Sequence, residues 1–460
     1  MKFNLQAARE CQPKSGFEAL REHGLTNPRA LASDLLSRVK RDDSYINLLL
    51  PTYLSRKGVS EGDRGLIQEL TYGALRWQLQ YDACIDFLAQ GKSIEDSVRV
   101  ALRLGFHQLF RMRIPSHAAI HETVELVKQK SPKAAGFTNA ILRNADRAGL
   151  ESLVKEASSK CNSIEALSIE TSHPAWMIRA FIDALALDSR DDVALLLSAN
   201  NKTPDVNLAA LSPDAMRRLK QAGLAQSPIS PIGFTVEGNP EPLISHDVRV
   251  QDFGSQLVAL TLLELVDKNV DFLDMCSGPG GKSAVLLSGL GQQGTIDCFE
   301  PFSHRAKLVR DAVGHDNRVS VLEHFGQSAS QNSYDAVLLD APCSGLGSIR
   351  RKPESRWRKS PNQLPELNAL QTELLDAGLF ALKPGGVLLY STCSPVISET
   401  NSQVVDALVR HPEVELIDLN PTLKGISPTL ELNQARKTVQ LWTDLHETDS
   451  MFMAGFRRVG

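Results

Sequence analysis

Residues 274–282 read Asp-Met-Cys-Ser-Gly-Pro-Gly-Gly-Lys and follow a strand-like run that begins at Val270. A strand that ends in a Gly-rich turn before a helix brings backbone N–H groups close to a ligand at the helix N-terminus. The glycine spacing matches neither the GxGxxG dinucleotide fingerprint nor the GxxxxGK[ST] phosphate loop. The stretch predicts a nucleotide-type cofactor site on an α/β fold and leaves the cofactor open, a plain tight turn being the alternative.

Strand and helix patterns alternate on both sides of this turn, from about residue 251 onward. Strands are expected at 270–276, 294–300, 319–323, 334–340 and 386–393, and helices at 283–290, 304–313 and 366–382. This alternation predicts a doubly wound, mostly parallel sheet.

The first 150 residues have a different pattern. Asn27-Pro28 is a good helix start, and further helices are expected at 62–76, 80–89, 96–112, 117–130 and 133–147, with no strand pattern. This region predicts an all-helical bundle. Between the two parts we expect linker helices and a small α+β subdomain, with Val206–Ala210 as one strand. The predicted domains are a flexible leader (1–25), the bundle (26–150), the linker with its subdomain (151–240) and the large α/β domain (241–460).

The bulk composition is that of a soluble, cytoplasmic, globular protein of two or three domains. The 460 residues are 42% hydrophobic and 23% charged, with no membrane-length apolar run and no secretory signal. The seven cysteines show no CxxC spacing, so neither a metal site nor a disulfide framework is expected. Net charge is −4, but residues 1–150 carry 22 Lys/Arg against 16 Asp/Glu and the remainder 28 against 38. A basic first third weakly favours a polyanion-binding module, against chance variation.

Two cysteines follow neighbouring strands of the predicted sheet. They lie in Asp340-Ala-Pro-Cys-Ser-Gly345 and in Ser391-Thr-Cys-Ser-Pro395. Either cysteine alone is better explained as a small core residue, but two thiols in polar turns at one sheet edge favour a shared cleft. Glu300, after the second strand, is placed to accept ribose hydroxyls, or else is a solvated carboxylate.

A basic run follows Cys343 and encloses an aromatic ring. Guanidiniums for phosphate and a ring for stacking are what a single-stranded RNA site needs, although a solvated charged face is the alternative. The predicted RNA-binding residues are Arg350, Arg351, Lys352, Arg356, Trp357 and Arg358.

Taken together, these motifs resemble the RNA 5-methylcytosine methyltransferases, over residues 241–460. DMCSGPGGK, DAPCSG and STCSP fall in that family's order and spacing. The first third resembles the NusB-type RNA-binding domain, through Asp63-Arg64, Tyr72-Gly73, Ile114-Pro115, 117–124 and 137–143. The combination resembles the family's small-subunit ribosomal RNA enzymes. It implies a class I methyltransferase domain, S-adenosylmethionine as cofactor, 16S ribosomal RNA as partner, no metal or membrane, and a monomer.

The resemblance also implies residue roles. Cys393 would be the nucleophile that adds to carbon 6 of cytosine, and Cys343 would assist product release. Asp340 would face the base and cofactor, and a raised pKa would let its carboxyl group protonate the ring nitrogen. The implied cofactor-binding residues are Asp274, Cys276, Ser277, Gly278, Pro279, Gly280, Gly281, Lys282, Glu300, Arg305 and Asp340.

The sequence departs from the family's pattern at several positions. Ser277 and Gly278 stand where alanines are usual, and residues 324–327 (His-Phe-Gly-Gln) carry no acid where an Asp usually lies near the adenine. Two other functions stay open. One is an RNA-binding assembly factor with a decayed cofactor site. The other is a methyltransferase acting on an exocyclic amine, which would have no use for Cys393.

Overall fold

The computed structural model describes residues 27–42, 44–55 and 59–459, so the predicted leader at 1–25 lies outside the described residues. The chain divides into two compact units. One contains the described residues up to Ile178 together with Lys352–Arg358, and the other contains Arg179–Arg351 and the chain from Lys359 onward. The short segment Lys352–Arg358 thus belongs to a different unit from the residues on both sides of it. The predicted domain boundaries at residues 25, 150 and 240 stay a prediction.

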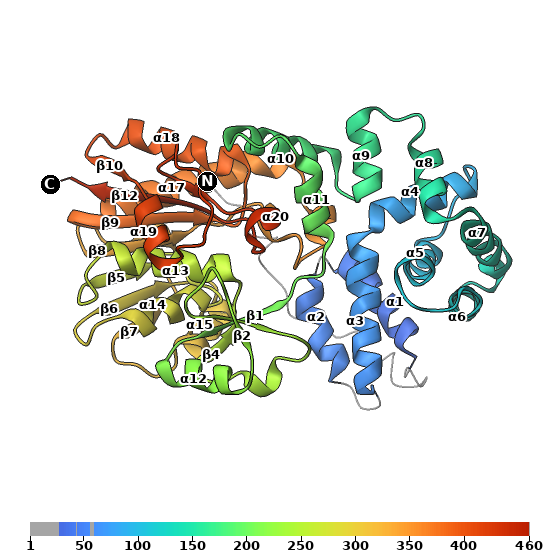
Figure 1. Ribbon diagram of the computed structural model, residues 1–460, viewed down its shortest axis with the longest axis horizontal. Coiled ribbons are helices and arrows are strands. Elements are labelled where there is room, and N and C mark those ends of the chain that lie inside the picture. Colours follow the sequence, from blue (N-terminus) through green and yellow to red (C-terminus); the bar gives the residue numbers. More distant parts are fainter. Residues whose placement is uncertain (1–26, 43, 56–58, 460) are drawn as a thin grey trace. The chain divides into compact units, whose positions relative to one another are not determined.

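The first unit is helical, as predicted. Its central helix α5 (Asp96–Arg111) contacts α1, α3, α4, α6 and α7 (Figure 1). The side chain of Asn27 caps α1 by accepting a hydrogen bond from the Arg29 N–H at 2.9 Å. The other helices are α1 (Pro28–Arg41), α2 (Ile46–Leu54), α3 (Glu61–Arg76), α4 (Gln78–Ala89), α6 (Ser116–Lys130), α7 (Ala135–Ala148), α8 (Leu150–Ser158), α9 (Ser163–Thr171), α10 (Ala175–Leu187), which continues into the second unit, and the short α16 (Ser355–Arg358).

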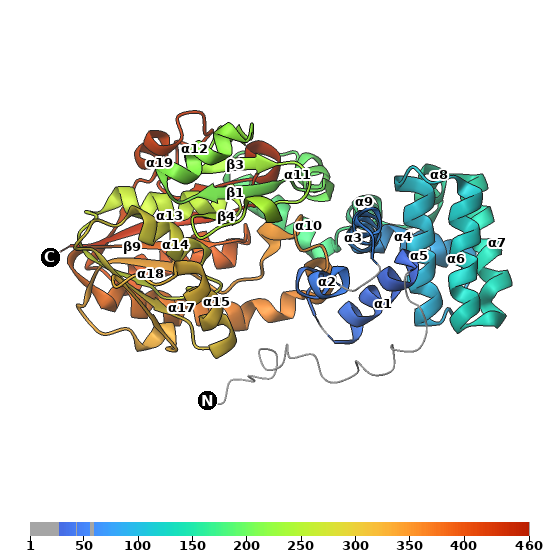
Figure 2. The same cartoon turned by 90° about the horizontal axis from the view of Figure 1, so that it is seen from below.

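The second unit begins with a small antiparallel sheet of order β2-β3-β1-β4. Its strands are β1 (Val206–Ala210), as predicted, β2 (Ala225–Gln226), β3 (Gly233–Val236) and β4 (Val248–Val250). The helices α11 (Val193–Asn201) and α12 (Pro213–Gln221) flank β1 in the chain. In Figure 2 this sheet lies over α13 (Phe253–Leu265), which β1 also contacts.

The large sheet has the order β10-β12-β9-β8-β5-β6-β7, which Figure 1 shows from top to bottom, and β11 pairs with β12. Its strands are β5 (Asp271–Asp274), β6 (Thr295–Phe299), β7 (Val319–Leu322), β8 (Tyr334–Asp340), β9 (Leu382–Thr392), β10 (Val414–Ile417), β11 (Val439–Gln440) and β12 (Phe452–Arg458). From β9 to β7 all pairs are parallel, whereas β12 is antiparallel to both of its neighbours on the path. The doubly wound, mostly parallel sheet predicted from the sequence is confirmed.

Helices cover both faces of this sheet. One apolar cluster joins it to α13, α14 and α15, and another joins it to α17 and α18. The bounds are α14 (Gly281–Gly289), α15 (Ser303–Val313), α17 (Leu364–Ala381), α18 (Asn401–Arg410), α19 (Asn420–Ile426) and α20 (Thr443–His446). Residues 336–339 of β8 are all fully buried, as a central parallel strand requires. Within the described residues, no helix is both long and apolar enough to cross a membrane.

The parallel strands bring their carboxyl ends to one edge of the sheet. Asp274 ends β5, Asp340 ends β8, and Thr392 ends β9 directly before Cys393. Asp340 is paired in register with Ser391. The segments that the sequence singled out are therefore neighbours in space because parallel pairing aligns their ends.

Candidate active site

The two predicted cysteines lie side by side. Cys343 follows β8 and Cys393 follows β9, and their sulfur atoms are 3.4 Å apart. Both side chains are half-buried. The hydrogen bond to Cys393, together with burial, raises the pKa of Cys343 well above its ordinary value. The surroundings of Cys343 therefore favour its protonated form, and either thiol can be the donor in the contact between the two sulfurs.

An ion pair lies at the same edge. The Lys282 Nζ is 2.7 Å from Asp340 Oδ2, and the Ser391 hydroxyl donates to Asp340 Oδ1 at 2.9 Å. Burial alone lowers the pKa of Lys282, but the charge and hydrogen bond of Asp340 outweigh this effect and the net direction is upward. Lys282 is therefore an ammonium group that donates a hydrogen bond to Asp340. The expected acid, Asp340, acts here as the acceptor for two neighbours.

The Gly-rich turn needs its glycines for space. Gly280 has a φ of +100°, and a Cβ there would lie 2.5 Å from the Ala312 Cβ. A Cβ on Gly278 would lie 2.1 Å from Glu300 Oε2. An alanine at residue 278 would therefore require the end of the Glu300 side chain to move.

Three of the predicted cofactor-binding residues, Gly278, Glu300 and Arg305, contact one another around this turn. Arg305 donates to the Gly278 carbonyl at 2.8 Å and lies 3.3 Å from Glu300 Oε2. The Ser277 hydroxyl donates to the Phe299 carbonyl at 3.0 Å. Pro279 follows Gly278 in the turn, and burial raises the pKa of the Cys276 thiol. Residues 276–279 lie between β5 and α14, whereas Glu300 follows β6 and Arg305 lies in α15.

Two buried acceptor oxygens beside α14 have no hydrogen-bond partner among the described residues. Asp274 is 1% exposed; its Oδ2 accepts from the Ser283 hydroxyl at 2.7 Å, while Oδ1 is unpartnered. Burial raises the pKa of Asp274 to about 7. The Gln251 Oε1 is likewise unpartnered, and the amide group of Gln251 lies 3.6 Å from where a Cβ of Gly281 would stand. Buried polar atoms are rarely left unpaired, so both oxygens indicate a bound donor.

These groups fit the amino-acid end of S-adenosylmethionine. Its ammonium group supplies three N–H donors for oxygens such as Asp274 Oδ1 and Gln251 Oε1, and its carboxylate suits the free N–H groups at the start of α14. Glu300 lies at the end of β6, where a ribose is bound in comparable sheets. The sequence analysis did not identify Gln251, because the burial of its side chain cannot be predicted from the motif alone.

The loop after β7 differs from the family's pattern in the structure as well. The Glu300 N–H donates to the Leu322 carbonyl, so this loop begins beside the ribose position. His324 and Gln327 are exposed there, and Phe325 is 56% exposed. Residues 324–327 of this loop therefore present an aromatic ring and neutral polar groups.

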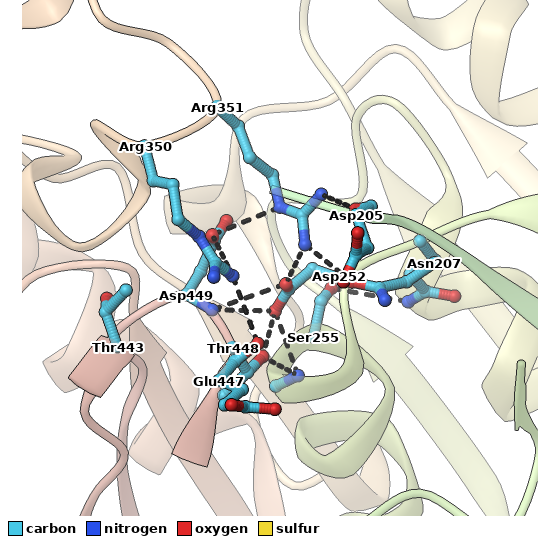
Figure 3. A network of polar contacts seen from close by, with 12 residues as sticks. Asp205, Asn207, Asp252, Ser255, Arg350, Arg351, Thr443, Glu447, Thr448 and Asp449 are labelled. Atoms are coloured by element: carbon cyan, nitrogen blue, oxygen red, sulfur yellow. Dashed lines mark hydrogen bonds and ion pairs between the residues drawn. The ribbon is translucent and has the colours of Figure 1, made fainter. Parts of the chain in front are cut away.

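The basic run begins inside a network of the protein's own charges (Figure 3). Arg351 lies 2.6 Å from Asp252 and 3.1 Å from Asp449, and also donates to the Asn207 side chain. Arg350, which is 7% exposed, donates to the Glu447 carbonyl. Burial alone would raise the pKa of Asp252, but the charge of Arg351 outweighs it and the net direction is downward. These guanidiniums hold the small sheet, α13 and the chain before β12 together.

The rest of the run is built into the helical unit. Arg356 is 1% exposed and donates to the carbonyls of Arg76 and Ser172 at 3.0 and 3.1 Å. The Trp357 indole N–H donates to the Leu75 carbonyl, and Arg358 stacks 4.0 Å from the centre of the Tyr45 ring. These contacts within the protein occupy the side chains of Arg356, Trp357 and Arg358, and their predicted role in RNA binding stays a prediction. Contact of RNA with the exposed Lys352 stays a prediction.

Sequence analysis also missed Glu399, which is fully buried behind the two cysteines. Its carboxylate accepts hydrogen bonds from the residues that follow them, Ser344 and Ser394. The sequence does show that a serine follows the cysteine in both motifs. A buried acceptor joining those serines could only be found once the two turns were placed together.

Comparisons with known proteins agree with this geometry. A model of the family described as 16S rRNA methyltransferase RsmB/F matches residues 260–457, and a model of the NusB family matches residues 26–147. Ribosomal RNA small subunit methyltransferase B of Pseudomonas putida is 35% identical over 85% of this chain and 91% of its own length. The protein of the same name from Escherichia coli is 31% identical over 85% and 92%.

Two further matches extend over nearly the whole chain. A Mycobacterium tuberculosis protein named only as a methyltransferase is 37% identical over 95% of this chain and 98% of its own length. The crystal structure of PH0851 has a TM-score of 0.75 at 20% identity and covers 94% of this chain and 99% of that one. At that identity the likeness to PH0851 shows the fold alone.

The doubly wound sheet, with its Gly-rich turn after β5, defines a class I methyltransferase. More specifically, the chain belongs to the RsmB/F family of rRNA methyltransferases and carries a NusB-family domain ahead of the catalytic one. This membership confirms the predicted family and the predicted enzyme, an S-adenosylmethionine-dependent RNA (cytosine-5-)-methyltransferase. RNA is accordingly its class of substrate.

Proposed function

We propose that this enzyme methylates carbon 5 of a cytosine in 16S ribosomal RNA through a covalent adduct between Cys393 and the base. The single observation that carries the proposal is the 3.4 Å contact between the Cys343 and Cys393 sulfurs, at the strand ends beside the Lys282–Asp340 pair. A methyltransferase acting on an exocyclic amine has no use for such a thiol pair.

The chemistry explains why a thiol is needed. Carbon 5 of cytosine is a poor nucleophile until a thiolate adds to carbon 6, which makes carbon 5 enamine-like. When bound, S-adenosylmethionine supplies a methyl group made electrophilic by its sulfonium. A base then removes the carbon-5 proton, and the thiolate leaves by elimination. Cysteine is both a strong nucleophile and a competent leaving group.

We assign the two sulfurs different roles. Because Cys343 stays protonated, its thiol can donate a hydrogen bond to the Cys393 sulfur and stabilise it as the thiolate nucleophile. Cys393 then attacks carbon 6, and Cys343 lies within reach of the adduct to assist its breakdown.

Lys282 and Asp340 are proposed to hold the base during addition. Negative charge develops on the pyrimidine ring as the thiolate adds, and a proton donor at the ring nitrogen or carbonyl oxygen lowers the barrier. The ammonium of Lys282 holds the proton of the pair, so we assign the donor role to Lys282 and an accepting role toward the exocyclic amine to Asp340.

The substrate is the finer part of the proposal. Relatives named ribosomal RNA small subunit methyltransferase B and the NusB-family domain support 16S rRNA. Bisulfite sequencing of ribosomal RNA from cells with and without the gene tests it. We expect one or a few 16S cytosines to resist conversion in the parent and to convert fully in the deletion strain.

Complementation makes that experiment specific. The wild-type gene should restore the protected cytosines, whereas a Cys393→Ala gene expressed at the same level should not. Identical conversion of 16S rRNA in all strains would refute the proposed substrate.

A further inference from the structure

The carboxylate of Glu399 joins the two cysteine turns from behind. Glu399 is fully buried and follows β9 in the short helix Ile397–Glu399. Its Oε1 accepts from the Ser344 N–H at 2.7 Å, and its Oε2 accepts from the hydroxyls of Ser344 at 2.5 Å and Ser394 at 2.6 Å. One serine directly follows each active-site cysteine in sequence.

Neighbouring residues extend this connection. Gln371 of α17 donates to Glu399 Oε1 at 3.2 Å and to the Pro342 carbonyl at 2.8 Å, so the residues on both sides of Cys343 are held. The Tyr390 hydroxyl donates to the Glu399 carbonyl at 2.7 Å. A buried carboxylate is tolerated only when hydrogen bonds replace its water, and here four donors converge on it.

The donors come from the turns of both cysteines, so the carboxylate also links these two turns to each other. The two turns leave neighbouring strands, and the hydroxyl oxygens of Ser344 and Ser394 lie 3.1 Å apart. Both hydroxyls donate to the same carboxylate oxygen of Glu399, so neither turn can move away from the other without losing a hydrogen bond to that carboxylate. The sulfurs are already in contact, and a shift of about 1 Å at either turn would separate them from a common target.

We propose that Glu399 is a positioning residue that clamps the turns of Cys343 and Cys393 together, so that both sulfurs serve one cytosine. The inference rests on the proposed function for its meaning in catalysis. Glu399 itself touches neither the sulfurs nor the base. Its effect passes through the backbone of Ser344 and the hydroxyls of the two serines.

The spacing of the sulfurs can be measured without RNA or cofactor. Diamide oxidises two adjacent thiols to a disulfide: the sulfurs lose two electrons and two protons, which the N=N bond of diamide takes up to become a hydrazine. Alkylation and mass spectrometry then give the rate at which the Cys343–Cys393 disulfide forms. We expect Glu399→Gln to slow this rate by about 10-fold, because loose turns bring the sulfurs into contact less often.

A matched control is Glu415→Gln, which removes an exposed carboxylate from β10 of the same sheet and should oxidise at the wild-type rate. Ser394→Ala, which removes one donor only, covers the case in which Glu399→Gln fails to fold. Disulfide formation in the double variant Glu399→Gln/Ser394→Ala should be no slower than in Glu399→Gln alone, because the two residues act through one contact. Wild-type or faster oxidation in a folded Glu399→Gln, or strictly additive effects, would overturn the clamp.

Methylation kinetics give a second readout. Glu399→Gln should lower kcat by about 10-fold or more while the KM for RNA and the Kd for S-adenosylmethionine stay within about two-fold. Equal losses in kcat and in binding would mark a merely structural residue. If disulfide formation slows but no protein methylates RNA, the clamp stands and the proposed function fails.

Discussion

Two adjacent segments of this chain, the turn around Cys343 and the basic run 350–358, were expected to form one functional cleft. Their side chains have opposite fates. The sulfur of Cys343 faces another sulfur at 3.4 Å, and the surrounding hydrogen bonds go to Ser344 and leave the thiol available. The guanidiniums of Arg351 and Arg356 donate hydrogen bonds to carboxylates and backbone carbonyls of the protein itself.

The difference shows which polar groups indicate function in a folded chain. Charge and aromatic character are shared by an RNA-binding loop and an anchor that joins parts of a fold, so composition cannot separate them. What separates them is whether the fold satisfies the group. A satisfied buried guanidinium is structural, whereas a group that the protein presents or leaves unpaired is available to a ligand.

The largest test of this comparison is the removal of each presented sulfur. Cys393→Ala should abolish methylation and leave S-adenosylmethionine affinity within a few-fold, because the nucleophile touches the base rather than the cofactor. Cys343→Ala should accumulate a covalent adduct with RNA, because addition to carbon 6 proceeds while its breakdown is impaired. Denaturing gel electrophoresis with cytosine-containing 16S fragments reads both outcomes.

The controls for this test follow from the assigned roles. The double variant should form no slow-migrating band, and neither should Cys393→Ala. A slow-migrating band from Cys393→Ala would mean that Cys343 is the nucleophile and that Cys393 assists product release. If Cys343→Ala gives no band with any cytosine-containing RNA, the covalent mechanism is wrong.

The next largest effect is expected from a satisfied guanidinium. Arg356→Ala should destabilise the helical unit by about 3 kcal/mol, because it opens a cavity and leaves the carbonyls of Arg76 and Ser172 without a donor. Lys352→Ala, four residues earlier and exposed, should leave the melting temperature unchanged and weaken RNA binding a few-fold at most. Thermal unfolding and RNA titration distinguish the two.

The reverse pattern would break the comparison. If Arg356→Ala kept the wild-type melting temperature and instead reduced RNA affinity and its salt dependence, the guanidinium would be an RNA contact and the structural assignment would fail.

Much of the fold was predictable because it depends on local signals. Asn27 before Pro28 started a helix, and the unbroken apolar run ending at Asp340 formed a central strand. The proximity of Cys343 and Cys393 followed from strand order. Partners that are distant in sequence were not predictable: Glu399 lies 55 residues from Ser344, and Arg356 lies 184 from Ser172. Only the folded chain shows which donors meet which acceptors.

The smallest predicted effect is the change in stability on replacing Asp274, a buried acid with one carboxylate oxygen unpaired among the described residues. Its pKa is about 7 in the fold against 3.8 ordinarily, so the folded state binds the proton more tightly than the unfolded state. Stability therefore falls as pH rises from about 4 to 7 and is level above that window. Asp274→Asn, which keeps the shape without the charge, removes this penalty.

Thermal unfolding at two pH values measures the difference. The stability advantage of the Asp274→Asn protein over wild type should be larger at pH 8 than at pH 5 by about 2.5 kcal/mol, because the penalty grows with each pH unit up to the folded-state pKa. The exposed control Asp311→Asn should change neither value. The same Asp274→Asn protein should bind S-adenosylmethionine more weakly at pH 8, because an anionic oxygen suited to its ammonium group is lost. If the variant gained stability without losing cofactor affinity, the unpaired oxygen of Asp274 would not be a ligand-binding group. An unpaired buried polar atom would then not be enough, by itself, to identify a functional residue in this fold.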